Sequence, residues 1–183
     1  MDKTNKPEQA FDEAFQVCDK VRERVLEFLD KVTQADSEKR PQEQEWSIGE
    51  VAHHLILVEN RYRDQMIEVI QTGREGEFDQ ETVQSGRLFP LEDVADITKA
   101  PKGKASKPVE PSHRLPIDEL REQLHQLRAE TKAQLIPHRS RELGDLWHEH
   151  PRLGAMTLYE KIRLIGYHEL KHLAQMKRCL QKS

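Results

Sequence analysis

The sequence predicts an all-α protein, a single four-helix bundle that spans residues 1–183. Its apolar residues recur at steps of three and four in four separate segments, which is the period of an amphipathic helix. Only 36% of the residues are hydrophobic and 34% are charged, a balance that suits helices with a narrow apolar stripe and a broad charged face. A chain of 183 residues is long enough for one well-cored domain but not for two. The four helices are predicted at about 7–33, 47–72, 117–136 and 157–180.

The first two helices are indicated by different signals. In the first segment, the apolar stripe begins at Phe11 and ends at Val32. The second segment opens with Ser47 as a natural N-cap and Glu50 three residues later, which together predict a capping box. Its apolar stripe fades near Thr72, where we expect the helix to end.

The third and fourth helices are bounded by proline and by a second cap. The third begins after Pro116 and is stopped by Pro137, because proline cannot continue a helix. The fourth begins with Thr157 and Glu160, the same capping-box spacing as in the second helix.

The link over residues 73–115 differs from the rest of the chain. It contains four glycines and a lysine-rich stretch, Lys99–Lys107, so it is predicted to be loop or partly disordered. The other two links are short, whereas this long one allows the second and third helices to run parallel through a crossover. The predicted architecture is therefore a four-helix bundle with one overhand connection.

Composition excludes several classes of protein. With 33 acidic and 29 basic residues the formal charge is −4, which argues against a partner such as nucleic acid or an anionic membrane surface. No apolar run approaches the ~20 residues of a membrane span, and the first ten residues lack the apolar region of a signal peptide. The two cysteines, Cys18 and Cys179, do not make a disulfide framework. We therefore expect a cytoplasmic protein.

Histidines carry most of the functional signal. His168 and His172 are four residues apart on the last predicted helix, so both imidazoles lie on one face and can reach one metal ion. Helical-wheel positions place both beside the apolar stripe of that helix. Buried polar groups need partners, and a metal ion would satisfy both.

A third ligand would have to come from another helix, and the second helix offers two candidates. His54 lies beside the apolar stripe, whereas His53 points away from it and is predicted to be solvated surface. His54 is therefore the candidate metal ligand. The spacing alone favours the alternative that His54 makes a plain hydrogen bond in the core.

Two further residues of the last helix have possible roles at such a site. Glu169 falls near the centre of the apolar stripe, where a carboxylate needs a cation, a hydrogen-bond donor or a metal-bound partner. It would accept a ring N–H of a ligand histidine or act as a general base; alternatively, a rotation of the helix places it at the rim of the bundle. Gln175 would support a ligand histidine, or lie on the surface.

Three motifs in order resemble those of the DinB/YfiT-like metalloenzyme superfamily. Residues 46–55, WSIGEVAHHL, are similar to the pattern W-[ST]-x-x-[EQ]-x-x-x-H-L. Residues 150–160 resemble its H-P-x-x-G-x-x-[ST] motif before the last helix, and residues 168–176 its H-x-x-x-H-x-x-Q-[IM] motif. The resemblance covers about residues 8–180, and Lys99–Lys107 departs from it.

This resemblance implies an up-down-down-up bundle and a divalent cation, most often nickel or zinc, held by His54, His168 and His172. It also implies a homodimer, because members of this family are often homodimers, and a small-molecule substrate, because some relatives transfer low-molecular-weight thiols. Three neutral ligands leave the cation Lewis-acidic with room for a water or a thiol, which suits thiol S-transfer or hydrolysis. Two hypotheses follow: a metal-dependent transferase or hydrolase, or a non-catalytic helical stress-response or binding module with a structural or vestigial metal.

Overall fold

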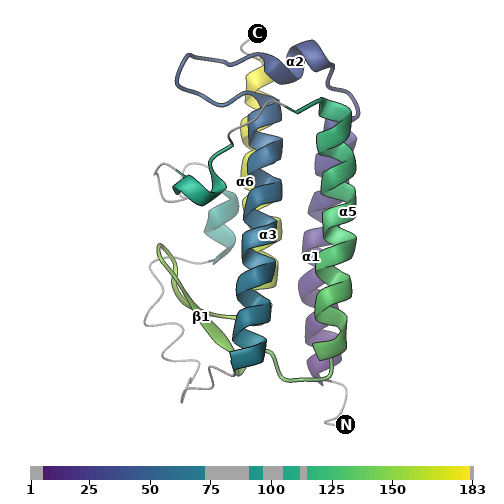
Figure 1. Ribbon diagram of the computed structural model, residues 1–183, viewed down its shortest axis with the longest axis vertical. Coiled ribbons are helices and arrows are strands. Elements are labelled where there is room, and N and C mark those ends of the chain that lie inside the picture. Colours follow the sequence, from purple (N-terminus) through teal and green to yellow (C-terminus); the bar gives the residue numbers. More distant parts are fainter. Residues whose placement is uncertain (1–5, 73–90, 97–104, 112–114, 182–183) are drawn as a thin grey trace.

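Four long helices make up most of the protein, and they lie side by side in the computed structural model (Figure 1). The structure describes residues 6–72, 91–96, 105–111 and 115–181. The long helices are α1 (Lys6–Leu29), α3 (Ile48–Thr72), α5 (Ile117–Leu135) and α6 (Leu158–Gln181). Helix α1 packs against α6 and α5, and α3 packs against the same two helices. The prediction of an all-α protein is confirmed in this general sense.

The two predicted capping boxes are present. At the start of α3, the Ser47 N–H donates to Glu50 over 2.9 Å and the Glu50 N–H donates to Ser47 Oγ over 3.3 Å. At the start of α6, Thr157 and Glu160 make the same reciprocal pair, at 2.9 and 3.2 Å. Both helices that carry the candidate metal ligands therefore begin where the sequence predicts.

The predicted end of the first helix is wrong by four residues. Helix α1 ends at Leu29, and a short helix that was not predicted, α2 (Gln34–Glu38), follows it. Thr33 is the N-cap of α2 and accepts from the Asp36 N–H over 3.1 Å, so the chain starts a new helix there. Val32 is still buried, which explains why its apolar signal seemed to continue the first helix.

Between α5 and α6 the chain forms one small hairpin. Strand β1 (Trp147–His150) pairs antiparallel with β2 (Gly154–Thr157), after the 3₁₀ turn η4 (Ile136–His138). Gly154 has φ 76°, a left-handed conformation that glycine adopts without strain, and it closes the three-residue turn of the hairpin. Within the described residues this hairpin is the only sheet.

The described parts of the long link contain two short 3₁₀ helices, η2 (Leu91–Ala95) and η3 (Lys107–Val109). Helix η2 packs on α6 and η3 packs on α3. The predicted loop over 73–90, 97–104 and 112–114 lies outside the described residues, and so do Lys99, Lys102 and Lys104 of the basic stretch. Lys107 is exposed.

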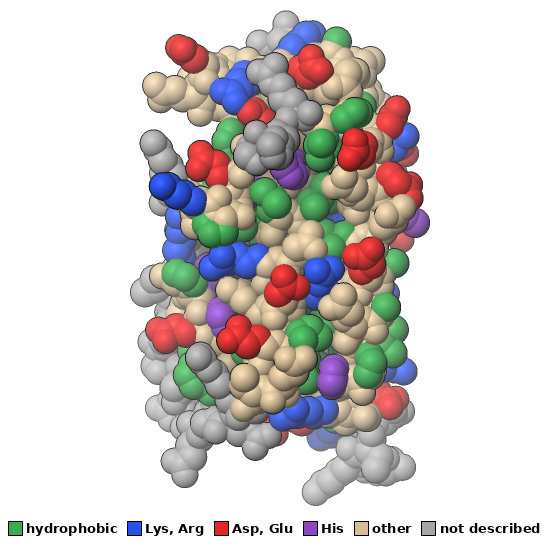
Figure 2. Space-filling model, viewed as in Figure 1, with side chains coloured by type: hydrophobic (Ala, Val, Ile, Leu, Met, Phe, Trp, Pro, Cys, Tyr) green, Lys and Arg blue, Asp and Glu red, His purple; other side chains and the backbone are tan. Residues whose placement is uncertain are grey.

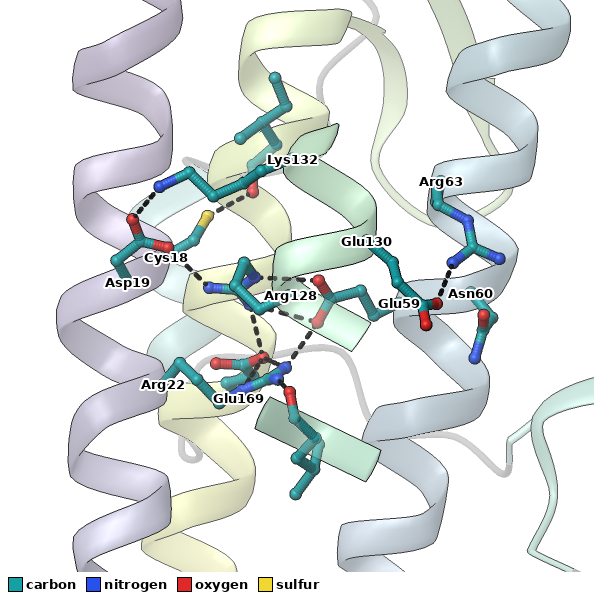
Figure 3. A network of polar contacts seen from close by, with 12 residues as sticks. Cys18, Asp19, Arg22, Glu59, Asn60, Arg63, Arg128, Glu130, Lys132 and Glu169 are labelled. Carbon is teal, nitrogen blue, oxygen red and sulfur yellow. Dashed lines mark hydrogen bonds and ion pairs between the residues drawn. The ribbon is translucent and has the colours of Figure 1, made fainter. Parts of the chain in front are cut away.

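The core is divided by a layer of buried charge. One hydrophobic cluster lies at the end of the bundle that holds the C-terminus of α1 and the start of α3, and a second lies at the opposite end. Between them each long helix contributes one charged side chain; the four are Arg22, Glu59, Arg128 and Glu169, all at most 6% exposed. Figure 3 shows them pointing towards one another between the helices.

Hydrogen bonds satisfy most of this layer. Glu59 accepts from Arg22 and from Arg128 Nε, the latter over 2.9 Å, and Glu169 Oε1 accepts from Arg22 Nε over 3.1 Å and Arg128 Nη2 over 2.9 Å. Two positive and two negative groups make the layer neutral. Burial disfavours the charged form of Glu59, but Arg128 and Arg22 hold the pKa of Glu59 below its ordinary value.

The surface is rich in charge of both signs. Figure 2 shows acidic and basic side chains interspersed over the visible face, with small hydrophobic areas between them. Of the described helices, none has the length and apolar character that crossing a lipid bilayer requires.

Candidate metal centre

Three imidazoles from two helices converge on one point. His54 comes from α3, and His168 and His172 come from α6, which packs against α3. Each ring offers one ligand nitrogen, and the three nitrogens lie within 4.8 Å of one another. The ring centroids are 4.4 to 5.2 Å apart. The structure therefore brings together the three histidines that the sequence singled out.

Hydrogen bonds orient two of the rings. His54 Nδ1 lies 2.6 Å from the carbonyl oxygen of Val109, and His172 Nδ1 lies 2.8 Å from Gln175 Oε1. A carbonyl oxygen can only accept, so each Nδ1 carries the proton and each Nε2 keeps its lone pair. Such contacts are typical of metal-binding histidines, whose second nitrogen donates to a carbonyl or carboxylate.

The spacing of the rings suits a small cation. His168 Nε2 and His172 Nε2 are 3.1 Å apart. Two nitrogens bound to one tetrahedral zinc ion at the usual bond length would be roughly 3.3 Å apart. This contact is favourable when one ring donates a hydrogen bond to the other or when a cation lies between the two nitrogens. The donor set fits a divalent cation such as zinc or nickel.

The electrostatic surroundings keep the imidazoles neutral, as metal binding requires. Burial lowers the pKa of His172 to about 3, with further contributions from His54 and Lys171. Burial also lowers the pKa of His168 well below its ordinary value, followed by the effects of His172 and His54. Burial also lowers the pKa of His54, although the hydrogen bond from His54 to the Val109 carbonyl opposes this change.

Two neighbours of the site were not predicted as contacts of His54. The ring of Trp46 lies 4.9 Å from the ring of His54, centroid to centroid. The Val109 carbonyl belongs to η3, fifty-five positions along the chain from His54. A backbone carbonyl has no side-chain signature, so no sequence pattern could have indicated this contact. Gln175 was predicted, as one of two alternatives, to support a ligand histidine, and it contacts His172.

The prediction for His53 is wrong. It was expected on the solvated surface, but the side chain is 9% exposed and counts as buried. A helical wheel assumes one buried face, whereas α3 contacts α2, α5, α6 and η3. Almost every residue from Val51 to Glu59 is therefore buried, whichever way it points.

Glu169 lies in the charged layer and outside the histidine cluster. At 2% exposed it is not at the rim of the bundle, so that alternative is wrong. The cations it needs are Arg22 and Arg128, which both donate to Oε1, while Oε2 is buried without a hydrogen-bond partner among the described residues. Its expected role as a general base stays a prediction.

Comparison with known proteins identifies a relative and a family. A 28% identical relative is the uncharacterized protein YuaE of Bacillus subtilis (strain 168), aligned over 156 residues, or 79% of this chain and 83% of that protein. The family model of the DinB superfamily matches residues 18–176, a range that contains all three histidines. With most of its length matched, the chain belongs to the DinB superfamily.

Proposed function

We propose that the protein binds one divalent cation through His54, His168 and His172 and acts as a metal-dependent enzyme on a small molecule. The observation that carries this proposal is the convergence of three neutral imidazoles with no carboxylate among them. Such a set adds no negative charge, so a bound zinc or nickel ion would supply Lewis acidity that lowers the pKa of a thiol or a water. Thiol S-transfer is the first candidate reaction and hydrolysis the second.

The chain's own residues prepare the site for this role. Val109 and Gln175 hold two rings with Nε2 turned to the common point, which removes the cost of orienting them when the cation binds. The ring of Trp46 packs beside the ring of His54, with 4.9 Å between the centroids. His168 is half-buried whereas His54 and His172 are buried, so we infer that substrate reaches the site past His168.

The arrangement of the helices supports a further proposal, an up-down-down-up course with the crossover between α3 and α5. Helices α3 and α5 begin at the end of the molecule where α6 finishes (Figure 1). Helix α3 packs against α6, and α5 packs against α1. The homodimer implied by the sequence resemblance and the cytoplasmic location expected from the composition are proposals of the same kind.

Metal analysis of purified variants tests the site. Wild-type protein loaded with zinc should hold one ion per chain, and His54→Ala should lower the affinity ~100-fold or more, because a ligand is lost. Gln175→Ala should lower it by about 10-fold, since only the orientation of His172 is lost. His125→Ala is the matched control, because His125 is an exposed histidine on α5. Full stoichiometry and affinity in His54→Ala would disprove the three-histidine site.

Turnover distinguishes the enzyme from a structural metal site. Wild-type protein, metal-free and zinc-loaded, is assayed with a small thiol and a chlorodinitrobenzene electrophile, and separately with ester substrates. Metal-dependent turnover that His54→Ala abolishes supports the proposal. A metal that raises the melting temperature without any turnover favours the non-catalytic module.

A further inference from the structure

A second polar cluster lies about two helical turns from the three histidines. It consists of Tyr62 on α3, Lys161 on α6 and His150 at the end of β1. Lys161 precedes His168 by seven residues, or roughly 10 Å along α6, and points to nearly the same side of that helix. Because α3 packs against α6, Tyr62 meets this side of α6. The Lys161 ammonium lies 4.9 Å from the centroid of the Tyr62 ring.

The hydrogen bonds of His150 determine where its proton lies. His150 Nδ1 accepts from the backbone N–H groups of Arg152 and Leu153, both over 3.2 Å. The proton of the neutral ring is therefore on Nε2, which lies 3.2 Å from Tyr62 Oη and donates to it. The Tyr62 hydroxyl thus accepts one hydrogen bond, and its own proton has no acceptor among the described residues.

Lys161 also has more hydrogen-bond donors than acceptors among the described residues. Its ammonium has three N–H groups, and one donates to Gln65 Oε1 over 2.8 Å. No other acceptor and no carboxylate partner is found for it in the described part of the chain, although the side chain has no exposed surface. Burying an unpaired cation is costly, so among the described residues Lys161 has an unmet demand for negative charge.

The surroundings of this cluster are basic. The pKa values of its three members are shifted by the charges of basic groups: Arg61 on α3, and His148 and Arg152 of the hairpin. No described acidic group shifts them. Burial and then Arg61 lower the pKa of Lys161 to about 7. Burial, followed by Lys161, lowers the pKa of His150 to about 4. Within the described part of the chain, a negatively charged oxygen is the group that this environment lacks.

We propose that Lys161 and Tyr62, with His150 positioning the Tyr62 hydroxyl, form a binding subsite for an oxyanion. The subsite would take a carboxylate or phosphate group of the substrate whose reactive atom lies at the metal centre, and this role in orienting substrate rests on the proposed function. Tyr62 and His150 are half-buried and Lys161 is fully buried, so the anion reaches the amine on the side that Tyr62 and His150 border.

Lysine NMR on the full-length, metal-free protein tests the subsite without the metal. The Lys161 side-chain signal, labelled with ¹³C and assigned by its loss in Lys161→Met, is followed during titrations with acetate and with inorganic phosphate. Chloride keeps the ionic strength constant. Saturable binding should raise the pKa of Lys161 by about one unit, because the anion stabilises the ammonium. Tyr62→Phe should weaken that binding by about three- to tenfold, since one hydrogen bond is lost.

Two controls separate the possible outcomes. Lys177 is an exposed lysine on α6, and its signal should show no saturable response. If the Lys161 signal does not respond to either anion, or if Tyr62→Phe leaves the response unchanged, the subsite is disproved. The stronger of the acetate and phosphate responses identifies the chemical class of the anion. Zinc stoichiometry, measured after a separate portion of each preparation is loaded with zinc, keeps failure of the subsite distinct from failure of the metal centre.

Discussion

Single buried ionisable residues determine how this protein should respond to pH. Three imidazoles at the candidate metal centre and a fourth, His150, have pKa values held below the ordinary value, with burial as the first cause for each. These rings stay neutral in the folded chain at a pH where an unfolded chain would protonate them. Proton uptake therefore favours the unfolded state as the pH falls.

We predict that the free energy of unfolding of the metal-free protein decreases as the pH falls below 6.5, the ordinary histidine pKa, towards about 3, the value held by His172. The unfolded chain binds more protons throughout this window, so stability rises with pH. One such imidazole contributes about 1.4 kcal/mol per pH unit where only the unfolded state is protonated. Urea denaturation at several pH values measures the slope.

Two histidine variants provide the comparison for this pH dependence. His172→Gln should flatten the slope, because it removes one of the neutral buried rings. His125→Gln should leave the slope unchanged, because that ring is exposed on α5. Equal slopes in the two variants would contradict the assignment of the pH dependence to the buried histidines.

At the scale of the helices, one glycine sets how closely α1 approaches α6. A Cβ atom at Gly166 would lie 3.1 Å from Cys18 Cα and 3.3 Å from Cys18 N, so the obstacle is backbone that cannot rotate away. Cys18 also donates from Sγ to the Ile162 carbonyl over 2.8 Å, which ties the two helices at the same place. Gly166 precedes His168 by two residues, so this contact also sets the position of a candidate ligand.

We predict that Gly166→Ala lowers the free energy of unfolding by about 1–3 kcal/mol, because α1 must move away from α6. The better helix propensity of alanine, up to ~1 kcal/mol, offsets part of this loss. Gly144→Ala is the control, because its tight contact is the flexible end of the Glu142 side chain. Thermal or urea unfolding measures both variants. A Gly166→Ala protein as stable as wild type would show that the helices separate without cost.

At the scale of the whole molecule, the layer of Arg22, Glu59, Arg128 and Glu169 joins all four long helices (Figure 3). Each arginine contacts both carboxylates, so a helix that slid along its axis would leave buried charges unpaired. The apolar clusters above and below the layer tolerate small shifts better, since dispersion contacts are not directional. We infer that the charged layer fixes the register of the bundle.

We predict that Glu59→Gln destabilises the protein by about 3–5 kcal/mol, because it leaves two buried arginines with one carboxylate. Arg121→Ala is the matched surface control. Arg121 forms ion pairs with Asp30 and Asp118, whose side chains are mostly exposed. Its loss should lower the free energy of unfolding by less than about 1 kcal/mol. Chemical denaturation measures both changes. Similar effects of the two substitutions would contradict a structural role for the buried layer.

The sequence predicts the local features of this protein well. Capping boxes at Ser47 and Thr157 need only residues three positions apart, and the helical period needs only a few turns of chain. The boundary after Leu29 and the hairpin before α6 were missed, since short elements leave little periodic signal. The histidine pair on α6 was visible for the same local reason, as four residues are about one turn.

The sequence by itself determined the four long helices, the caps of α3 and α6 and the shared face of His168 and His172, because these depend on neighbours within one or two turns. Only the tertiary structure decided which long-range partners those groups have. In the folded chain His53 is buried, and Glu169 accepts hydrogen bonds from two arginines. The Val109 carbonyl accepts a hydrogen bond from His54. These contacts join helices far apart in the chain, and the free energy of burying a polar group depends on what surrounds it in space.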